Sequence, residues 1–149
     1  VKVGKNNPRA GMTDLFGNIE PNKLECSKKY LWGKNYVSNS SIKYEYCLGS
    51  VHSSYPDFIM KDSFGRIHIF EVKSVNPAKN ISTSFDNDDY RAKLEELKRC
   101  YKQASLLTEH IFYLPVLQGD IWHITCLMNG NESTLSQEQF EKFVSSKPV

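Results

Sequence analysis

One segment, Arg66–Val75, constrains the fold more than any other part of the chain. Its apolar side chains alternate onto both faces of a predicted strand: Ile67 and Ile69 lie on one face, and Phe70 and Val72 lie on the other. A strand that is apolar on both sides belongs in the middle of a sheet whose two faces are covered. The segment therefore predicts a layered domain with a buried central strand.

The elements expected around this strand supply the covering layers. The Asp-Ser-Phe-Gly sequence at 62–65 is typical of a turn, so the segment before it is expected to pair with the central strand as a hairpin. A first helix is expected from Pro21 to about Gly33, since proline suits a helix start and glycine its end. Alternation and helical spacing predict strands over 42–48, 54–61, 66–75, 111–117 and 121–127, a helix from 88 to about 109, and a last helix opened by the capping box of Ser136 and Gln139. This order predicts an α/β fold in which helices flank a central mixed sheet.

Composition limits the class of protein further. The chain has 149 residues, of which 40% are hydrophobic and 24% charged, which suits one globular domain and excludes coiled-coil, collagen-like and wholly disordered chains. Residues 1–20 are expected to be a flexible lead-in, and residues 21–149 a single domain. The start at Val1, with no initiator methionine and no signal peptide, predicts a piece of a larger chain.

Cysteine spacing and hydropathy indicate the compartment. Cys26, Cys47, Cys100 and Cys126 are too far apart in sequence for a metal knuckle and too few for a disulfide scaffold. Reduced thiols in a cytoplasmic protein are therefore expected. No apolar run approaches the ~18–20 residues that a membrane-spanning helix needs, so no membrane partner is expected.

Charge is unevenly distributed along the chain. Residues 1–73 carry 11 Lys and Arg against 7 Asp and Glu, a balance of +4, whereas residues 74–149 carry 8 against 10, a balance of −2. A mildly basic half permits a polyanionic partner such as DNA without requiring one.

The pattern that carries chemistry is Pro56-Asp57 followed by Glu71-Val72-Lys73. Residues two apart on a strand share a face, so Glu71 and Lys73 point the same way, beside a strand that carries Asp57. Paired carboxylates hold a hard cation such as Mg²⁺, which activates water and neutralises charge on a phosphate. A neighbouring lysine orients the water or stabilises that charge. Val72 can reach the metal only through its backbone carbonyl, while its side chain packs in the core.

The same spacing occurs a second time, at Glu96-x-Lys98, in a predicted helix where it is expected to be a solvated surface pair. Only Glu71-x-Lys73 lies on a buried strand, where unpaired charges are costly. A buried ion network of Asp57, Glu71 and Lys73, without catalysis, is the structural alternative.

At these residues the sequence resembles a known family. Residues 54–60 (Ser-Tyr-Pro-Asp-Phe-Ile-Met), a glycine-bearing turn and residues 69–74 (Ile-Phe-Glu-Val-Lys-Ser) resemble the signature of the PD-(D/E)xK nucleases. The expected element order matches that family's helix–strand–strand–strand–helix–strand core, the restriction-endonuclease-like αβββαβ fold. The greatest likeness is to the C-terminal nuclease domain of type III restriction subunits and other helicase-fused restriction endonucleases, and the segments 101–104 and 112–116 support it. The resemblance spans residues 21–127 and is strongest over 54–74.

The resemblance implies a site. Asp57 and Glu71 would be metal ligands, Lys73 the catalytic lysine, and Mg²⁺ the cofactor, with Mn²⁺ as a substitute. Many members add a glutamate from the first helix, for which Glu25 is the first candidate and Glu20 the second.

Three residues of the long predicted helix are candidate DNA contacts. Lys98 and Lys102 lie one turn apart and can reach a phosphate backbone, although a solvated helix face explains them too. Gln103 and Tyr101 face the site in many relatives, and for Tyr101 core packing is the favoured interpretation.

These patterns predict a Mg²⁺-dependent endonuclease that cleaves DNA, as the cleavage module of a helicase-like, type III restriction enzyme. The expected partners are DNA, a motor region, a methyltransferase subunit and a second copy of the domain for double-strand cleavage. Three alternatives stay open: a stand-alone nuclease such as a junction resolvase or toxin effector, a degenerate DNA-binding module, and a plain structural domain.

Overall fold

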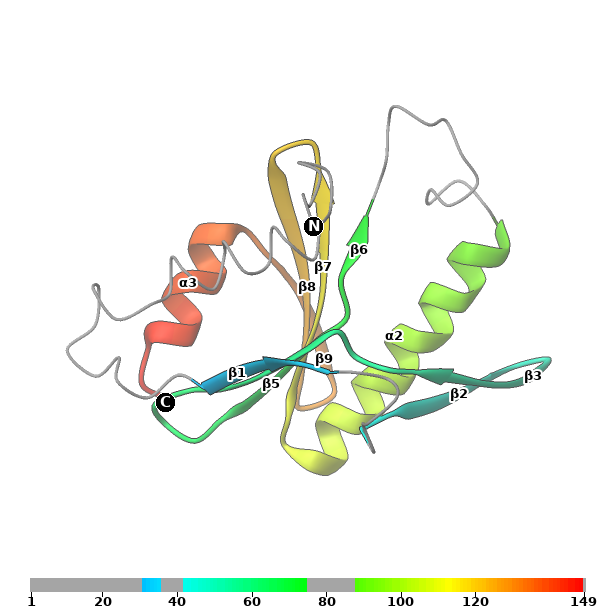
Figure 1. The fold of residues 1–149 in the computed structure, drawn as a ribbon, viewed down its shortest axis with the longest axis horizontal. Coiled ribbons are helices and arrows are strands. Elements are labelled where there is room, and N and C mark those ends of the chain that lie inside the picture. Colours follow the sequence, from blue (N-terminus) through cyan, green and yellow to red (C-terminus); the bar gives the residue numbers. More distant parts are fainter. Residues whose placement is uncertain (1–30, 36–41, 75–87, 149) are drawn as a thin grey trace.

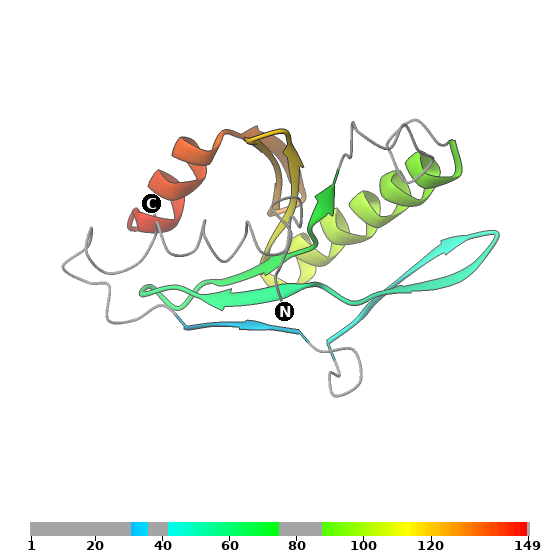
Figure 2. The ribbon, with the colours of Figure 1, turned by 45° about the horizontal axis from the view of Figure 1, so that its top comes forward.

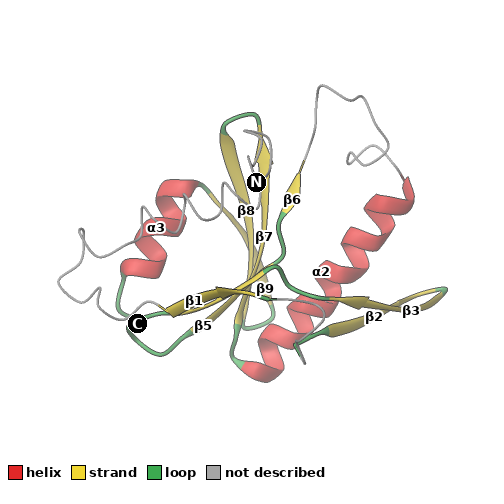
Figure 3. Cartoon of the chain, in the orientation of Figure 1, coloured by secondary structure: helices red, strands yellow, loops and turns green. Residues whose placement is uncertain are grey.

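In the computed structural model, the described residues are 31–35, 42–74 and 88–148, and over these the chain is an α/β protein dominated by strands (Figures 1 and 3). One mixed sheet has the strand order β1-β4-β5-β7-β8-β9, with the short β6 also paired to β7, and β2 and β3 form a second sheet. The elements are β1 (Leu31–Lys34), β2 (Tyr44–Leu48), β3 (Ser50–Ser54), β4 (Phe58–Lys61), β5 (Ile67–Phe70), β6 (Lys73–Ser74), α2 (Asp88–Thr108), β7 (Ile111–Gln118), β8 (Ile121–Met128), β9 (Asn131–Leu135) and α3 (Gln137–Ser145). The expected lead-in at 1–20 lies outside the described residues.

The central position predicted for the doubly apolar strand is confirmed. β5 lies between β4, which pairs with it antiparallel, and β7, which pairs with it in parallel. The predicted turn is also confirmed: Asp62 accepts hydrogen bonds at Oδ1 from the backbone N–H groups of Phe64 and Arg66, each at 2.9 Å. Gly65 adopts a φ of 83°, a conformation that glycine adopts at little cost.

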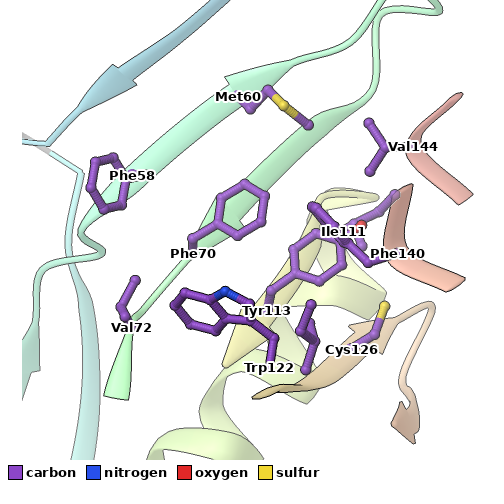
Figure 4. Packing of buried hydrophobic residues seen from close by; sticks show 11 residues of the cluster. Phe58, Met60, Phe70, Val72, Ile111, Tyr113, Trp122, Cys126, Phe140 and Val144 are labelled. Atoms are coloured by element: carbon purple, nitrogen blue, oxygen red, sulfur yellow. The ribbon is translucent and has the colours of Figure 1, made fainter. Parts of the chain in front are cut away.

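Two hydrophobic clusters, one on each face, hold the layers together. β7 and β8 run between α3 on one side and α2 on the other (Figure 1). On the α3 face, the rings of Phe70 and Tyr113 stack 4.8 Å apart and Phe140 of α3 packs edge-on against both (Figure 4). On the α2 face, Leu97 and Tyr101 of the helix pack against the sheet. The prediction that helices flank a mixed sheet is therefore confirmed for α2 and α3.

The prediction of a first helix from Pro21 to about Gly33 is wrong at its C-terminal end. Leu31–Lys34 forms strand β1, which pairs antiparallel with β4, so that Gly33 lies opposite Ile59 inside a ladder. Residues 21–30 lie outside the described residues. The open edge of β4 supplies backbone partners that an isolated helical spacing cannot reveal, and tertiary pairing overrides local propensity here.

The expected strand over 54–61 is in fact two strands. β3 ends at Ser54 and pairs with β2 through the turn at Gly49, while β4 begins at Phe58. Pro56, which lies between them, has no N–H for a ladder. The β2–β3 hairpin extends away from the main sheet and passes along α2 (Figure 2). Strands β3 and β9 were not predicted, because both are mostly exposed and polar and show no hydrophobic alternation.

The last helix begins as predicted. Ser136 and Gln139 form a reciprocal capping box at the start of α3. Within the described part of the chain, Cys47, Cys100 and Cys126 are free thiols. Neither described helix combines the length and the apolar character needed to cross a bilayer.

Candidate active site

The candidate site lies at the end of the β4–β5 hairpin that is opposite its turn. Asp57 directly precedes β4, and Glu71 and Val72 follow β5. The backbone N–H of Asp57 donates to the carbonyl of Phe70 at 2.7 Å, and its carbonyl accepts from Asn35 at 2.8 Å. The position of Asp57 is therefore fixed by β5 on one side and by the residue after β1 on the other.

The structure places Asp57 against the backbone of Val72, the residue between Glu71 and Lys73. The backbone N–H of Val72 donates to Oδ2 of Asp57 at 2.9 Å, and Nζ of Lys73 lies 2.7 Å from Oε1 of Glu71. Asp57 is 9% exposed, and the side chains of Glu71 and Lys73 are 12% and 20% exposed. We call these three residues the charged trio.

The sheet is interrupted where the trio lies. β5 and β6 keep one register against β7, with Phe70 opposite Tyr113 and Lys73 opposite Val116, yet residues 71 and 72 belong to neither strand. The N–H of Glu71 still donates to the carbonyl of Tyr113 at 3.0 Å. In a parallel ladder the carbonyl of Glu71 would then accept from residue 115, which is a proline and has no N–H. The expected continuous strand 66–75 is therefore wrong at this point, and Pro115 gives the physical reason.

The trio lies on the α2 face of the sheet. The alternation along β5 continues from Ile69, which packs against α2, to Glu71 and Lys73. The hydroxyl of Tyr101, a buried residue of α2, lies 2.9 Å from Oγ of Ser54. Burial raises the pKa of Tyr101, and the charge of Glu71 raises it further, as expected if the carboxylate faces the helix. The packing interpretation of Tyr101 is confirmed by its complete burial.

A groove with a cationic rim opens beside Lys73. It has a volume of about 260 Å³ and lies between the N-terminal half of α2 and strands β6, β7 and β8. Its cationic side chains are Lys73, Arg91 and Lys98, and Glu95 is the acidic residue of the lining. The remaining lining residues are Leu94, Leu114, Val116 and Thr125. We call this the trio groove.

The structure separates the candidate DNA contacts on the helix. Lys98 lines the trio groove, but its ammonium group is held by Glu95 at 3.1 Å and by Glu132 at 3.3 Å. Burial lowers the pKa of Lys98, and the hydrogen bonds to the two carboxylates outweigh this and raise it. Lys102 is exposed one turn further along, and Gln103 lines a different groove on the other flank of α2.

The second Glu-x-Lys pattern lies on a helix, as predicted, but its two residues do not pair with each other. Glu96 pairs with Arg99 at 3.3 Å, whereas Lys98 pairs with Glu95 and Glu132, and both Glu96 and Lys98 are half-buried. The first-helix candidates, Glu25 and Glu20, lie outside the described residues. Sequence analysis missed Arg91, although its spacing of seven residues from Lys98 places both on one face of a helix.

Oxygen donors dominate the trio, and this suits a hard divalent cation. Among residues 31–35, 42–74 and 88–148 no group of three or more His, Cys, Asp and Glu side chains gathers at a metal-binding distance. Asp57 and Glu71 supply two carboxylates, the donor number with which Mg²⁺ is commonly held when water and phosphate complete its shell. An ionised carboxylate accepts several hydrogen bonds or metal contacts, so the bond from Val72 does not by itself prevent Asp57 from contacting a metal.

Comparison with known proteins gave no family: neither a protein-family model, nor a curated protein, nor a solved structure matches this chain. The function is therefore argued from the site.

Proposed function

We propose that this protein is a metal-dependent nuclease that hydrolyses phosphodiester bonds in DNA, with Asp57, Glu71 and Lys73 as its catalytic residues. The observation that carries the proposal is the contact of Asp57 with the backbone of Val72, between Glu71 and Lys73. It places the carboxylate of Asp57 against the backbone between Glu71 and Lys73, where the sheet is interrupted and Lys73 lines a groove.

The trio divides the work of hydrolysis. Asp57 and Glu71 would hold Mg²⁺ or Mn²⁺, which when bound lowers the pKa of a coordinated water and neutralises charge on a phosphate oxygen. Lys73 is fixed beside Glu71 and would orient the attacking water. In an extended residue the N–H and the C=O point to the same edge, so we expect the carbonyl of Val72 to face Asp57 and to offer a further oxygen ligand.

The arrangement of elements supports a restriction-endonuclease-like core. An antiparallel β4–β5 hairpin, the covering helix α2 and the parallel strand β7 follow one another in the predicted order. We propose this core as the fold of residues 21–149.

The resemblance in sequence carries a finer proposal, that the domain is the cleavage module of a type III-like restriction enzyme. Its partners would be a motor region, a methyltransferase subunit and a second copy of the domain, since one such site cleaves one strand. Sedimentation of the domain with and without a DNA duplex tests the last of these.

Cleavage of supercoiled plasmid in Mg²⁺, Mn²⁺ or EDTA tests the proposed function. Asp57→Asn is the sharpest variant, because the amide oxygen still accepts the Val72 hydrogen bond while the negative charge is lost. Glu96→Gln is the matched control at the second Glu-x-Lys pattern.

The proposal predicts metal-dependent nicking that Asp57→Asn abolishes and Glu96→Gln retains. Equal cleavage by wild type and Asp57→Asn would contradict the assignment of the site. DNA binding that needs no metal, without cleavage by any form, would favour the degenerate DNA-binding module instead.

A further inference from the structure

The β2–β3 hairpin is an arm whose base is fixed to the body of the protein. The ring of Tyr44, at the start of β2, packs edge-on against Tyr101 of α2 and Phe112 of β7, with ring centroids 5.4 Å and 5.1 Å apart. At the end of β3, Oγ of Ser54 lies 2.9 Å from the hydroxyl of the same Tyr101. Both strands of the hairpin are therefore held at their base.

The rest of the hairpin presents one exposed face. Burial alternates along both strands, and Val51 of β3 lies directly opposite Cys47 of β2 on the exposed face. The next pair on this face is Ser53 with Glu45. Val51 is 69% exposed. An isolated two-stranded ribbon is at best marginally stable in water, so the arm depends on its fixed base while this face stays open to solvent.

The exposed face is compatible with an anionic partner. Residues 46–54 contain no Asp, Glu, Lys or Arg. Glu45, at the base of the face, forms an ion pair of 2.9 Å with Lys43, which offsets its charge. The face therefore has no uncompensated carboxylate that the two phosphate backbones beside a DNA groove would repel. The methyl groups of Val51 and the hydroxyl of Ser53 suit apolar and hydrogen-bonding contacts with base edges.

The arm leads directly into the candidate site. Ser54 precedes Asp57 by three residues, a path of at most about 11 Å. The five-residue strands carry the turn at Gly49 roughly 14 Å beyond that point, away from the main sheet (Figure 2). The major groove of B-form DNA is about 12 Å wide and about 8.5 Å deep, and it admits a two-stranded ribbon. The length of the arm therefore suffices to reach the floor of that groove from a phosphate held at the charged trio.

We propose that the β2–β3 hairpin enters the major groove beside the scissile phosphate, and that the substrate of the site is therefore double-stranded DNA. The exposed face, with Val51 and Ser53, would lie against the base edges. This inference rests on the proposed function and deepens it, because it names the form of DNA that is cleaved. Val51 contacts the substrate in this arrangement and takes no part in the chemistry.

Ile121 provides a matched control for Val51. It is 64% exposed, and like Val51 it lies two residues after a turn glycine with a positive φ, but in the β7–β8 hairpin. Val51→Asp and Ile121→Asp place the same charge at two exposed aliphatic positions. Any loss of DNA affinity that depends only on net charge will therefore be shared by the two variants.

The first experiment measures binding of a short labelled duplex, and of one of its strands alone, in EDTA. Wild type should bind the duplex more tightly than the single strand. Val51→Asp should weaken duplex binding about tenfold and single-strand binding by no more than about twofold, since only the duplex has a groove. Ile121→Asp should stay within about twofold of wild type on both. Equal losses in the two variants, no loss in either, or tighter binding of the single strand by wild type would overturn the inference.

The second experiment follows backbone amide signals of the wild-type protein by NMR as the same duplex is added, and so needs no variant. The inference predicts shifts at residues 48–53 and none at residues 118–121. A duplex whose major groove is filled by glucosylated hydroxymethylcytosine should not produce them. Equal shifts with the two duplexes, or no shifts in the hairpin, would overturn the inference. Shifts that follow protein concentration instead of DNA would assign the exposed face to contacts between copies of the chain and would overturn it too.

The two proposals fail in different ways. Shifts in the hairpin on adding the duplex, without any plasmid cleavage, would leave the hairpin assignment standing and overturn the nuclease. Cleavage that depends on Asp57, with no shifts in the hairpin, would overturn only the hairpin assignment.

Discussion

Two groups of charged residues lie at opposite ends and on opposite faces of the same β4–β5 hairpin, and they differ in how far the protein encloses them. At the turn, Asp62, Arg66 and His68 form what we call the turn network. At the other end lies the charged trio. Asp62 is 2% exposed and His68 is 0% exposed, whereas Lys73 of the trio lines a groove.

Every member of the turn network has a protein partner. The ring of His68 lies between Oδ2 of Asp62 and the hydroxyl of Tyr113, each 2.9 Å away. Arg66 bonds Asp62 and the carbonyl oxygens at the end of α3, including that of Ser146 at 2.9 Å. The network therefore ties the end of α3 to the hairpin turn.

Protonation states in the turn network fit a neutral histidine. Burial lowers the pKa of His68, and its bond to Asp62 opposes this shift only in part. Neutral His68 donates from Nε2 to Asp62 and accepts at Nδ1 from Tyr113, whose pKa burial raises well above 10. All the polar groups are satisfied within the protein, so this network has a structural role.

The contrast shows what distinguishes a site from a structural ion cluster in this fold. The turn network closes on itself through a continuous turn and a helix end. The trio lies where Pro115 interrupts the ladder and where β4 has not yet begun, and its Lys73 lines a groove. Four changes test this contrast, and the largest effect is expected at the turn.

Asp62→Ala should destabilise the protein by about 3–5 kcal/mol, because it leaves Arg66 and His68 in a buried place without their carboxylate. Two backbone N–H groups lose their acceptor as well. Urea unfolding followed by circular dichroism measures the change. A loss below about 1 kcal/mol would show that the turn network is not structural.

Lys73→Met should have the opposite effects to Asp62→Ala, with a large loss of cleavage and a small loss of stability. We expect plasmid cleavage to fall about 100-fold or more, because the group that orients water is lost. Stability should fall by about 1 kcal/mol, since the Lys73–Glu71 pair lies at a partly open edge. Cleavage rates and urea unfolding of the same preparation check both halves. Unchanged cleavage with a large loss of stability would show that the trio has a structural role and not a catalytic one.

Acid should destabilise the fold through the turn network. Burial raises the pKa of Asp62, but hydrogen bonds from His68 and Arg66 outweigh it and lower the pKa from 3.8 to about 2. A lowered carboxyl pKa stabilises the fold above the unfolded value, so about 2 kcal/mol is lost as the pH falls from about 4 to 2. The lowered pKa of His68 also reduces stability as the pH falls below 6.5, because the unfolded histidine then takes up a proton more readily than the folded one.

Asp62→Asn is the variant that isolates this acid effect, and Asp120→Asn, in the exposed β7–β8 turn, is its control. The free energy of unfolding of Asp62→Asn should fall less steeply than that of wild type between pH 4 and 2. If the free energies of unfolding of Asp62→Asn and wild type fell in parallel over this pH range, the assignment of the low pKa to Asp62 would be contradicted.

Pro115→Ala should have the smallest effect on stability, within about 1 kcal/mol. A restored ladder bond to the carbonyl of Glu71 is worth about 1 kcal/mol, and the greater freedom of the unfolded chain offsets most of it. The informative readout is hydrogen exchange, in which the new amide at position 115 should be protected. Fast exchange there would show that Pro115 is not what interrupts the sheet.

The sequence predicted the centre of the fold better than its edges. The β4–β5 hairpin, α2, β7, β8 and the capped α3 follow from alternation, turn chemistry and capping, which are local signals. Strand β1 depends on the free edge of β4. The polar strands β3 and β9 pair with the strands directly before them, β2 and β8, but their own side chains show no hydrophobic alternation that would predict them.

The candidate site could be predicted only in part for the same reason. Spacing along one strand placed Glu71 and Lys73 together, and their 2.7 Å contact agrees with it. The bond from Val72 to Asp57, the interruption opposite Pro115 and the groove beside Arg91 each join segments from different elements. Their geometry follows from the packing of α2 on the sheet, which no single segment of sequence encodes.

Binding of Mn²⁺, followed by paramagnetic broadening of backbone amide signals, tests the central claim most directly, because it needs neither a motor region nor a substrate. The account predicts broadening centred on Asp57 and residues 71–73, absent in Glu71→Gln and unchanged in Glu96→Gln. Broadening centred elsewhere, or equal in the two variants, would contradict the assignment of the trio as a metal centre.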